Sequence, residues 1–150
     1  MKKLFYLLAG VVILSACNES SNKTRSGEHT SHEHSVAGTA LTLNNGAKWK
    51  ADSITNHNVV NLKTFADNFR LKPFPSVNDY QILGSDLNAG INKMIQECKM
   101  SGPDHDALHK WLEPVLKETD QLKSITDTAV AKTTFKSLDA RIDAYHNFFE

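Results

Sequence analysis

The stretch Asn78–Lys99, NDYQILGSDLNAGINKMIQECK, decides the fold of this protein. Its apolar residues recur at intervals of three and four, which places them on one face of an α-helix. A seam of this kind, sustained over about six turns, is typical of a helix whose apolar face lies against other helices. The seam consists of Tyr80, Leu83, Leu87, Ile91, Met94 and Cys98.

The segment upstream of this stretch predicts another helix. Asp52 is a favourable N-cap, and the helical pattern continues to Arg70, after which Pro73 and Pro75 end it. A short extended entry with a turn is expected before it, over residues 41–46. The residues expected on the buried side of this helix are Ile54, Leu62, Phe65 and Phe69.

Two more helices are expected downstream. Ser101-Gly102-Pro103-Asp104 predicts a tight turn with a capping serine and an acid three residues on, which opens a helix that continues to about residue 124. Pro114 should kink this helix. The last helix is expected over residues 128–149. Their expected core residues are His105, Leu108, Leu112, Val115, Leu122, Phe135, Leu138, Ile142, Tyr145 and Phe149.

Short links between the later helices favour antiparallel neighbours, and no strand pattern follows Leu43. The sequence therefore predicts an all-α fold, an antiparallel up-down four-helix bundle over residues 41–150. About one hundred residues can bury a core of their own.

The N-terminal segment has the features of a secretory signal. Two lysines, Lys2 and Lys3, precede the apolar run Leu4–Leu14, which is too short for a permanent membrane span. Leu14-Ser15-Ala16-Cys17 resembles the lipobox of bacterial lipoproteins. The resemblance implies that residues 1–16 are removed, that Cys17 is lipidated, and that the protein is anchored to a membrane of the cell envelope on its extracytoplasmic side.

Residues 17–40 are expected to form a flexible linker, because they are polar and contain almost nothing apolar to bury. Within it, His29, His32 and His34 form a short histidine-rich tract. Mobile imidazoles this close together can scavenge a transition metal weakly, and the alternative is a plain solvated spacer.

The charge balance excludes a nucleic-acid role driven by charge. The chain has 17 basic and 17 acidic residues, a formal net charge of zero. Without the two lysines of the signal segment, 15 basic residues stand against 17 acidic ones, a balance near −2. The partners expected are the membrane, through the lipid anchor that the lipobox resemblance implies, and, for an interaction module, an envelope protein.

Chemistry-bearing side chains gather at one end of the predicted bundle. His105 and His109 lie four residues apart and stack on one helix face, as in helical metal sites, and Cys98 precedes them across a tight turn. Met100 and His146 are expected at the same end as accessory ligands. Thiolate, thioether and imidazole ligands favour copper or zinc, so we expect reversible binding of a soft transition metal.

Two other functions stay open from the sequence. Cys98 on an apolar seam is often a small buried hydrophobe, and His105 a hydrogen-bonded core residue, which would make the protein a cofactor-free interaction module. A b-type haem electron carrier is the weaker alternative. An enzyme is not expected, because the chain has no nucleophile elbow, phosphate-binding loop, dinucleotide fingerprint or His-Glu-x-x-His motif.

Overall fold

The computed structural model describes residues 40–150, and this part of the chain is all-helical, as predicted. The predicted signal segment, Cys17 and the histidines of the tract (His29, His32 and His34) lie outside the described residues. Among residues 40–150 there are isolated β-bridges but no strand. The helices are α1 (Ser53–Arg70), α2 (Val77–Glu97), α3 (Gly102–Ser124), α4 (Thr128–Asp143) and the short α5 (Tyr145–Phe148).

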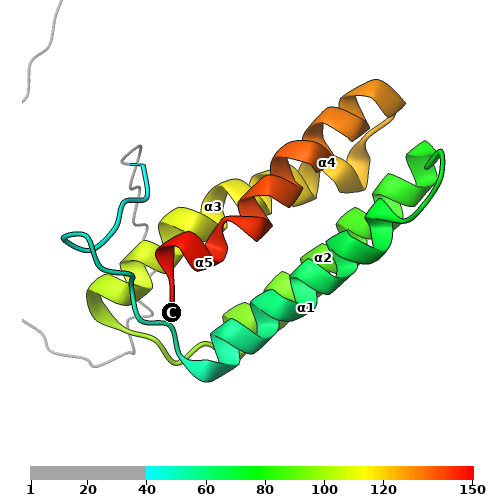
Figure 1. Cartoon of the computed structure of the whole chain (residues 1–150). Helices are drawn as coiled ribbons and strands as arrows, with labels where there is room; N and C mark the ends of the chain where they lie inside the picture. The colour runs from blue at the N-terminus through cyan, green and yellow to red at the C-terminus, as the bar shows by residue number, and fades with distance from the viewer. Residues whose placement is uncertain (1–39) are drawn as a thin grey trace, which may run out of the picture. The chain divides into compact units, whose positions relative to one another are not determined.

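The four long helices pack against each other around one core. Helix α2 contacts α1 on one side and α3 on the other, and α4 contacts both α3 and α1 (Figure 1). The seam predicted for α2 is confirmed, since its first five members are all buried. These are Tyr80, Leu83, Leu87, Ile91 and Met94.

Local sequence signals set where two of the helices begin. The Asp52 carboxylate accepts a hydrogen bond from the Thr55 backbone N–H at 2.7 Å, so the predicted N-cap of α1 is confirmed. Helix α2 begins with a capping box, in which the Ser76 hydroxyl accepts from the Asp79 N–H and the Asp79 carboxylate accepts from the Ser76 N–H. These contacts satisfy N–H groups that have no partner within their helices.

Phe65 does not lie in the core, contrary to the prediction. Its side chain is 38% exposed, and the fully buried position next to it is Ala66. The ring lies beside Gly90 of α2, at the edge of the contact between the two helices. Because Gly90 has no side chain, Leu62 of α1 approaches α2 closely there, and the Phe65 ring lies at the edge of that contact.

The last helix is shorter than predicted. Helix α4 ends at Asp143, Ala144 caps it, and α5 follows as a single turn. Phe149 then adopts an extended backbone and forms a parallel β-bridge with Trp49. Its ring is fully buried and stacks on the Tyr145 ring at a centroid distance of 4.7 Å.

Backbone hydrogen bonds tie the C-terminus to the segment that enters α1. The Trp49 N–H donates to the Phe148 carbonyl at 2.8 Å, the Glu150 N–H to the Trp49 carbonyl at 3.0 Å, and the Ala51 N–H to the Glu150 carbonyl at 2.9 Å. The predicted turn before this segment is present between Asn44 and Ala47. Both ends of the described chain therefore meet at one end of the bundle (Figure 1).

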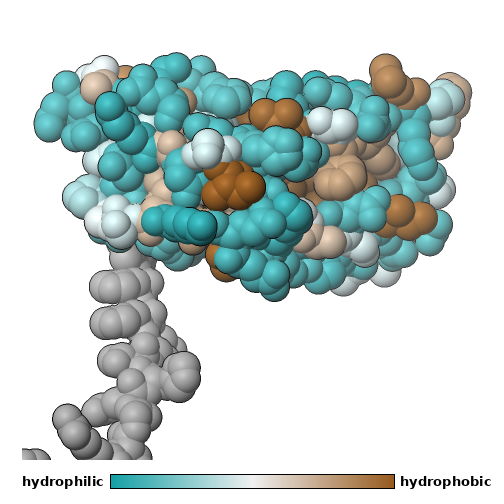
Figure 2. All heavy atoms as spheres, turned by 90° about the horizontal axis from the view of Figure 1, so that it is seen from below, coloured by the Kyte–Doolittle hydropathy of each residue, from teal (hydrophilic) through white to brown (hydrophobic). Residues whose placement is uncertain are grey.

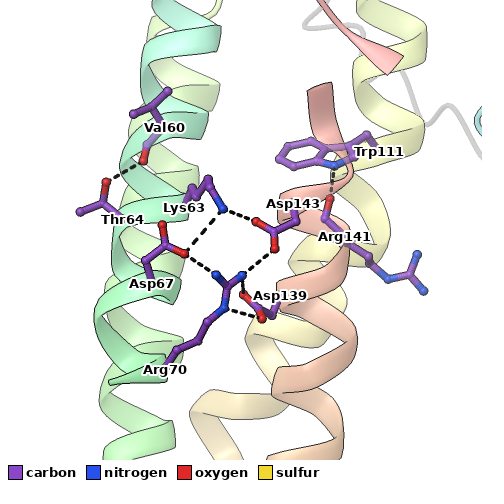
Figure 3. A network of polar contacts seen from close by, with 9 residues as sticks. All are labelled: Val60, Lys63, Thr64, Asp67, Arg70, Trp111, Asp139, Arg141 and Asp143. Atoms are coloured by element: carbon purple, nitrogen blue, oxygen red, sulfur yellow. Dashed lines mark hydrogen bonds and ion pairs between the residues drawn. The ribbon is translucent and has the colours of Figure 1, made fainter. Parts of the chain in front are cut away.

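An ion-pair network joins α1 to α4 (Figure 3). The Arg70 guanidinium of α1 binds Asp139 of α4 through two nitrogens, at 2.8 and 2.5 Å, and reaches Asp143 at 2.7 Å. Lys63 donates to Asp143 as well, and Asp67 receives both cations. Salt bridges therefore add to the hydrophobic contact between α1 and α4.

The face of the described part drawn in Figure 2 is mainly hydrophilic. On the face drawn in Figure 2, apolar side chains appear as separate patches among polar ones. No helix within residues 40–150 is long and apolar enough to cross a membrane.

Candidate functional site

Cys98 is the C-cap residue of α2 and begins the link between α2 and α3. Its backbone is extended, and its N–H still donates to the Met94 carbonyl at 2.9 Å. The thiol side chain is half-buried and packs against the core. Cys98 is a free cysteine.

Helix α3 carries the two histidines, but it begins differently from the prediction. Ser101 occupies the predicted N-cap position, but its side chain makes no capping hydrogen bond. The Asp104 carboxylate instead accepts from the Lys50 backbone N–H at 3.0 Å. The entry segment thus uses the acid that a capping box would have used. Helix α3 then continues through Pro114 to its end.

The structure brings Cys98, His105 and His109 together in a chain of contacts. The Cys98 Sγ lies 3.7 Å from Nδ1 of His105, and Nε2 of His105 lies 2.8 Å from Nε2 of His109. The two imidazole rings meet edge to face, with centroids 4.5 Å apart. His105 is half-buried and His109 is exposed. The two histidines therefore lie on one face of α3, as predicted, but their rings do not stack.

His105 stands between its two neighbours. One ring nitrogen faces the sulfur and the other faces His109, and these nitrogens point away from each other across the ring. A single ion therefore cannot meet the sulfur, His105 and His109 in this arrangement of the rings. Within residues 40–150, no group of three or more His, Cys, Asp or Glu side chains is placed to hold a metal ion.

The structure also shows where the two predicted accessory ligands, Met100 and His146, lie. Met100 is half-buried in the link between α2 and α3 and packs against the core. His146 is exposed on α5, and its ring lies edge-on to Tyr145 at a centroid distance of 5.2 Å. The structure thus gives each of these two side chains a packing contact of its own.

The sequence did not predict that Tyr145 and Asp52 form part of the surroundings of Cys98. Tyr145 is the first of these two residues. The buried Tyr145 hydroxyl donates to Asn56 Oδ1 at 2.9 Å. Burial raises the pKa of Tyr145 far above its usual range, and electrostatic interactions with Asp52 and Cys98 raise it further. The phenol therefore stays neutral. The helical spacing of Tyr145 predicted only that it is a core residue. No local sequence feature predicted the hydrogen bond from its hydroxyl to Asn56.

Asp52 is the second missed residue. Its carboxylate caps α1 and also accepts from the Lys99 backbone N–H at 2.9 Å, beside Cys98 in sequence. Burial opposes ionisation of Asp52, but the hydrogen bonds from Thr55 and Lys99 outweigh it and lower the pKa of Asp52. One ionised carboxylate thus fixes the start of α1 to the link that carries the thiol.

Two surface hollows lie elsewhere. One, of about 170 Å³, is lined by the entry segment and the outer face of α3, including Trp49 and Asp106. The other, of about 390 Å³, lies between α1 and α2 beside Phe65 and Gly90. Neither is lined by a histidine or a cysteine. The chain matches no protein-family model, and comparisons with curated proteins and with solved structures give no match either.

Proposed function

We propose that this protein is a lipid-anchored lipoprotein of the bacterial envelope that binds copper or zinc reversibly at one end of an antiparallel up-down helical bundle. The observation that carries the proposal is the pair of imidazole nitrogens 2.8 Å apart on one turn of α3, with a thiol against the other nitrogen of His105. Imidazole is a ligand for both metals. His109 is exposed and His105 is half-buried, so a metal ion can approach the pair from solvent.

The role proposed is to buffer or hand on a metal, not to turn over a substrate. A closed structural site supplies four protein ligands, whereas this pair leaves most of the coordination sphere to solvent or to a donor protein. Open positions allow an ion to enter and leave. Met100 and His146 are the accessory ligands of this proposal, and Cys98 contacts Nδ1 of His105, the nitrogen that faces away from His109.

The experiment is a titration of the full, reduced chain with Zn(II) and with Cu(I) against a competing chelator. His29, His32 and His34 are replaced by alanine throughout, so that the tract contributes nothing. We expect one equivalent that is lost in His105→Ala and in His109→Ala, and that persists in His57→Ala, a control at an exposed histidine on α1. Binding that survives both site variants would refute the proposal.

The lipid anchor has a separate test. Mass spectrometry of the mature protein from a bacterial envelope should show acylated Cys17 as the first residue, and Cys17→Ala should release the protein from the membrane fraction. A mature chain that begins elsewhere and stays soluble would contradict the anchor while leaving the metal proposal standing.

A second candidate, a cofactor-free interaction module, is favoured by one observation. The link between α1 and α2 exposes Leu71 and Phe74, with side chains 81% and 99% accessible. Fully exposed aromatic side chains are common at protein interfaces. If this candidate holds, Phe74→Ala should abolish cross-linking to an envelope protein in cells, and the His105→Ala variant should cross-link normally.

A further inference from the structure

The link between α1 and α2 displays apolar side chains that the rest of the fold does not cover. Residues 71–74, which we call the distal tip, are all exposed. Leu71 is 81% and Phe74 99% accessible, and Phe74 is the most exposed large hydrophobic residue among residues 40–150. Transfer of such side chains from water into an apolar medium is favourable. The distal tip therefore has apolar surface available to a partner.

The backbone of the distal tip holds the Phe74 ring outward at a conformational cost. The φ of Phe74 is 56°, in the left-handed region that a bulky L-residue rarely adopts. Pro73 and Pro75 flank it, and each proline fixes its own φ. Residues with strained backbones of this kind cluster at sites of binding. The ring is not buried within the fold, so a contact that offsets this cost lies outside it.

The distal tip fits a lipid surface better than a protein surface. A stable protein interface takes about 800 Å² and about 20–30 residues from each partner. The tip offers only a few contiguous residues, and ion pairs flank it, since Lys72 binds Asp79 at 2.7 Å and Arg70 binds Asp139 at 2.5 Å. A bilayer interface has no fixed shape to match, and Phe and Leu beside a lysine are typical of segments that lie in it.

The predicted anchor brings a bilayer within reach of the distal tip. The tip and residue 40 lie at opposite ends of the bundle (Figure 1), separated by α1, whose 18 residues are about 27 Å long. Residues 17–40, the linker expected from the sequence, have a root-mean-square reach of about 25–30 Å as a random coil. The effective concentration of a tethered group is highest when the reach of its linker matches the span. Two apolar side chains can therefore dock on a membrane to which the chain is already attached.

We propose that Leu71 and Phe74 insert into the surface of the membrane that carries the lipid anchor at Cys17. The inference rests on the anchor of the proposed function and adds a second contact with the same bilayer. It also orients the domain. The link between α2 and α3 is bonded to the start of α1 through Asp52, so the histidine pair at the start of α3 lies at the end of the bundle away from the lipid.

The test uses the full, acylated chain in vesicles of phosphatidylethanolamine and phosphatidylglycerol, with and without bromine on the acyl chains, because bromine quenches tryptophan on contact. Phe74→Trp places a reporter at the distal tip, and Trp49 and Trp111 of the unmodified chain give the baseline. In brominated vesicles we expect loss of most of the emission that Phe74→Trp adds. Ile95→Trp is the matched control, 49% exposed near the other end of α2, and bromine should not change the emission that it adds.

A second substitution in the Phe74→Trp chain tests insertion itself. Leu71→Asp should abolish the quenching, because an ionised carboxylate resists transfer out of water. Ile95→Asp makes the same change at the control position and should leave the quenching in place. Circular dichroism verifies the fold of each variant.

Three results would overturn the inference alone, in chains whose Cys17 is acylated by mass spectrometry and which float with the vesicles. These are no quenching of Phe74→Trp, equal quenching of Phe74→Trp and Ile95→Trp, and a Phe74→Trp reporter shielded only in intact envelopes, which would assign the distal tip to a protein partner. A chain that is not acylated and stays out of the vesicle fraction would refute the anchor together with this inference. The two failures are thus distinct, and the metal titration is independent of both.

Discussion

Phe74 has the most unfavourable backbone of any exposed aromatic residue in the described chain. Its φ is 56°, in the left-handed region, and its ring is 99% exposed. That conformation costs an L-residue about 1–2 kcal/mol, and burial of the ring does not offset the cost here. Asparagine tolerates this region better than other residues with a side chain.

Phe74→Asn should therefore stabilise the protein, by about 0.5–1 kcal/mol in the free energy of unfolding. Urea denaturation followed by circular dichroism measures it. The matched control is Leu71→Asn, also exposed but with a right-handed backbone, for which we expect a change near zero. A loss of stability in Phe74→Asn would mean that the ring makes a stabilising contact.

At the scale of single residues, part of the site was predictable. The spacing of His105 and His109 places both side chains on one helix face, because residues four apart on a helix lie over one another. The nitrogen that faces Cys98 could not be predicted, because it depends on the torsions of His105 and on the extended backbone after α2. The role of Asp104 was missed for a similar reason, since Lys50, its partner, is distant in sequence.

At the scale of the helices, two glycines of α2 have different neighbours. A Cβ built on Gly84 would lie 2.7 Å from the Lys123 backbone nitrogen of α3, which cannot move aside without shifting the helix. A Cβ on Gly90 would meet only the end of the Leu62 side chain at that distance, and Phe65 at 3.5 Å. Gly84 therefore sets how closely α2 and α3 approach.

Gly84→Ala should destabilise the protein by about 1–2 kcal/mol, since overpacking costs more than the helix propensity gained. Gly90→Ala is the matched variant. We expect it to leave the free energy of unfolding unchanged or to raise it by up to about 1 kcal/mol, because the Leu62 side chain can change its rotamer. Thermal and urea unfolding of both variants measure the difference. Equal changes in stability for the two variants would show that the α3 backbone moves aside as easily as the Leu62 side chain.

The ion-pair network between α1 and α4 gives stability a dependence on pH. The hydrogen bond from Lys63 lowers the pKa of Asp143 below its ordinary value of 3.8, burial opposes this, and the charge of Arg70 adds to the lowering. Because the folded pKa is below the unfolded one, Asp143 stabilises the fold above about pH 4. That stabilisation is lost as the pH falls through the folded pKa.

Asp143→Asn should cost about 1 kcal/mol or less at pH 7, because the pair is partly exposed and screened by solvent. The variant should also lose less stability than the unmodified chain between about pH 5 and pH 2. Urea titrations across this range, at low and at high salt, measure both effects. Parallel pH profiles would contradict the assignment.

How far the sequence predicts the helices depends on whether their ends are set locally. Asp52 and the α2 seam were predictable because a cap and a periodic pattern are local features. The end of α4 was not, because Phe149 leaves the helical path to pair with Trp49, about one hundred residues earlier. Phe65 likewise looks buried by spacing, but Leu62 and Ala66 are the buried residues on this part of α1, and the Phe65 ring lies at the edge beside Gly90.

At the scale of the whole described part, the C-terminus is a structural element. Phe149 is the penultimate residue of the sequence given, yet its side chain is fully buried and stacks on Tyr145. Phe149→Ala should therefore cost about 3–5 kcal/mol, the range for a buried aromatic, although terminal residues are normally tolerant. Urea unfolding measures the cost, with Phe148→Ala, which is half-buried, as the milder control. A cost below about 1 kcal/mol would show that the terminus frays.

The bonds between Trp49 and the C-terminus also decide how this domain responds to mechanical load. Tension applied through residue 40 reaches Trp49 and Ala51 before it reaches α1. The backbone bonds there, to Phe148 and Glu150, lie across the direction of the chain, so a pull along the segment shears them together. A domain held in this way resists unravelling from the N-terminal side of α1, and α1 stays helical until the pairing between Trp49 and Phe149 breaks.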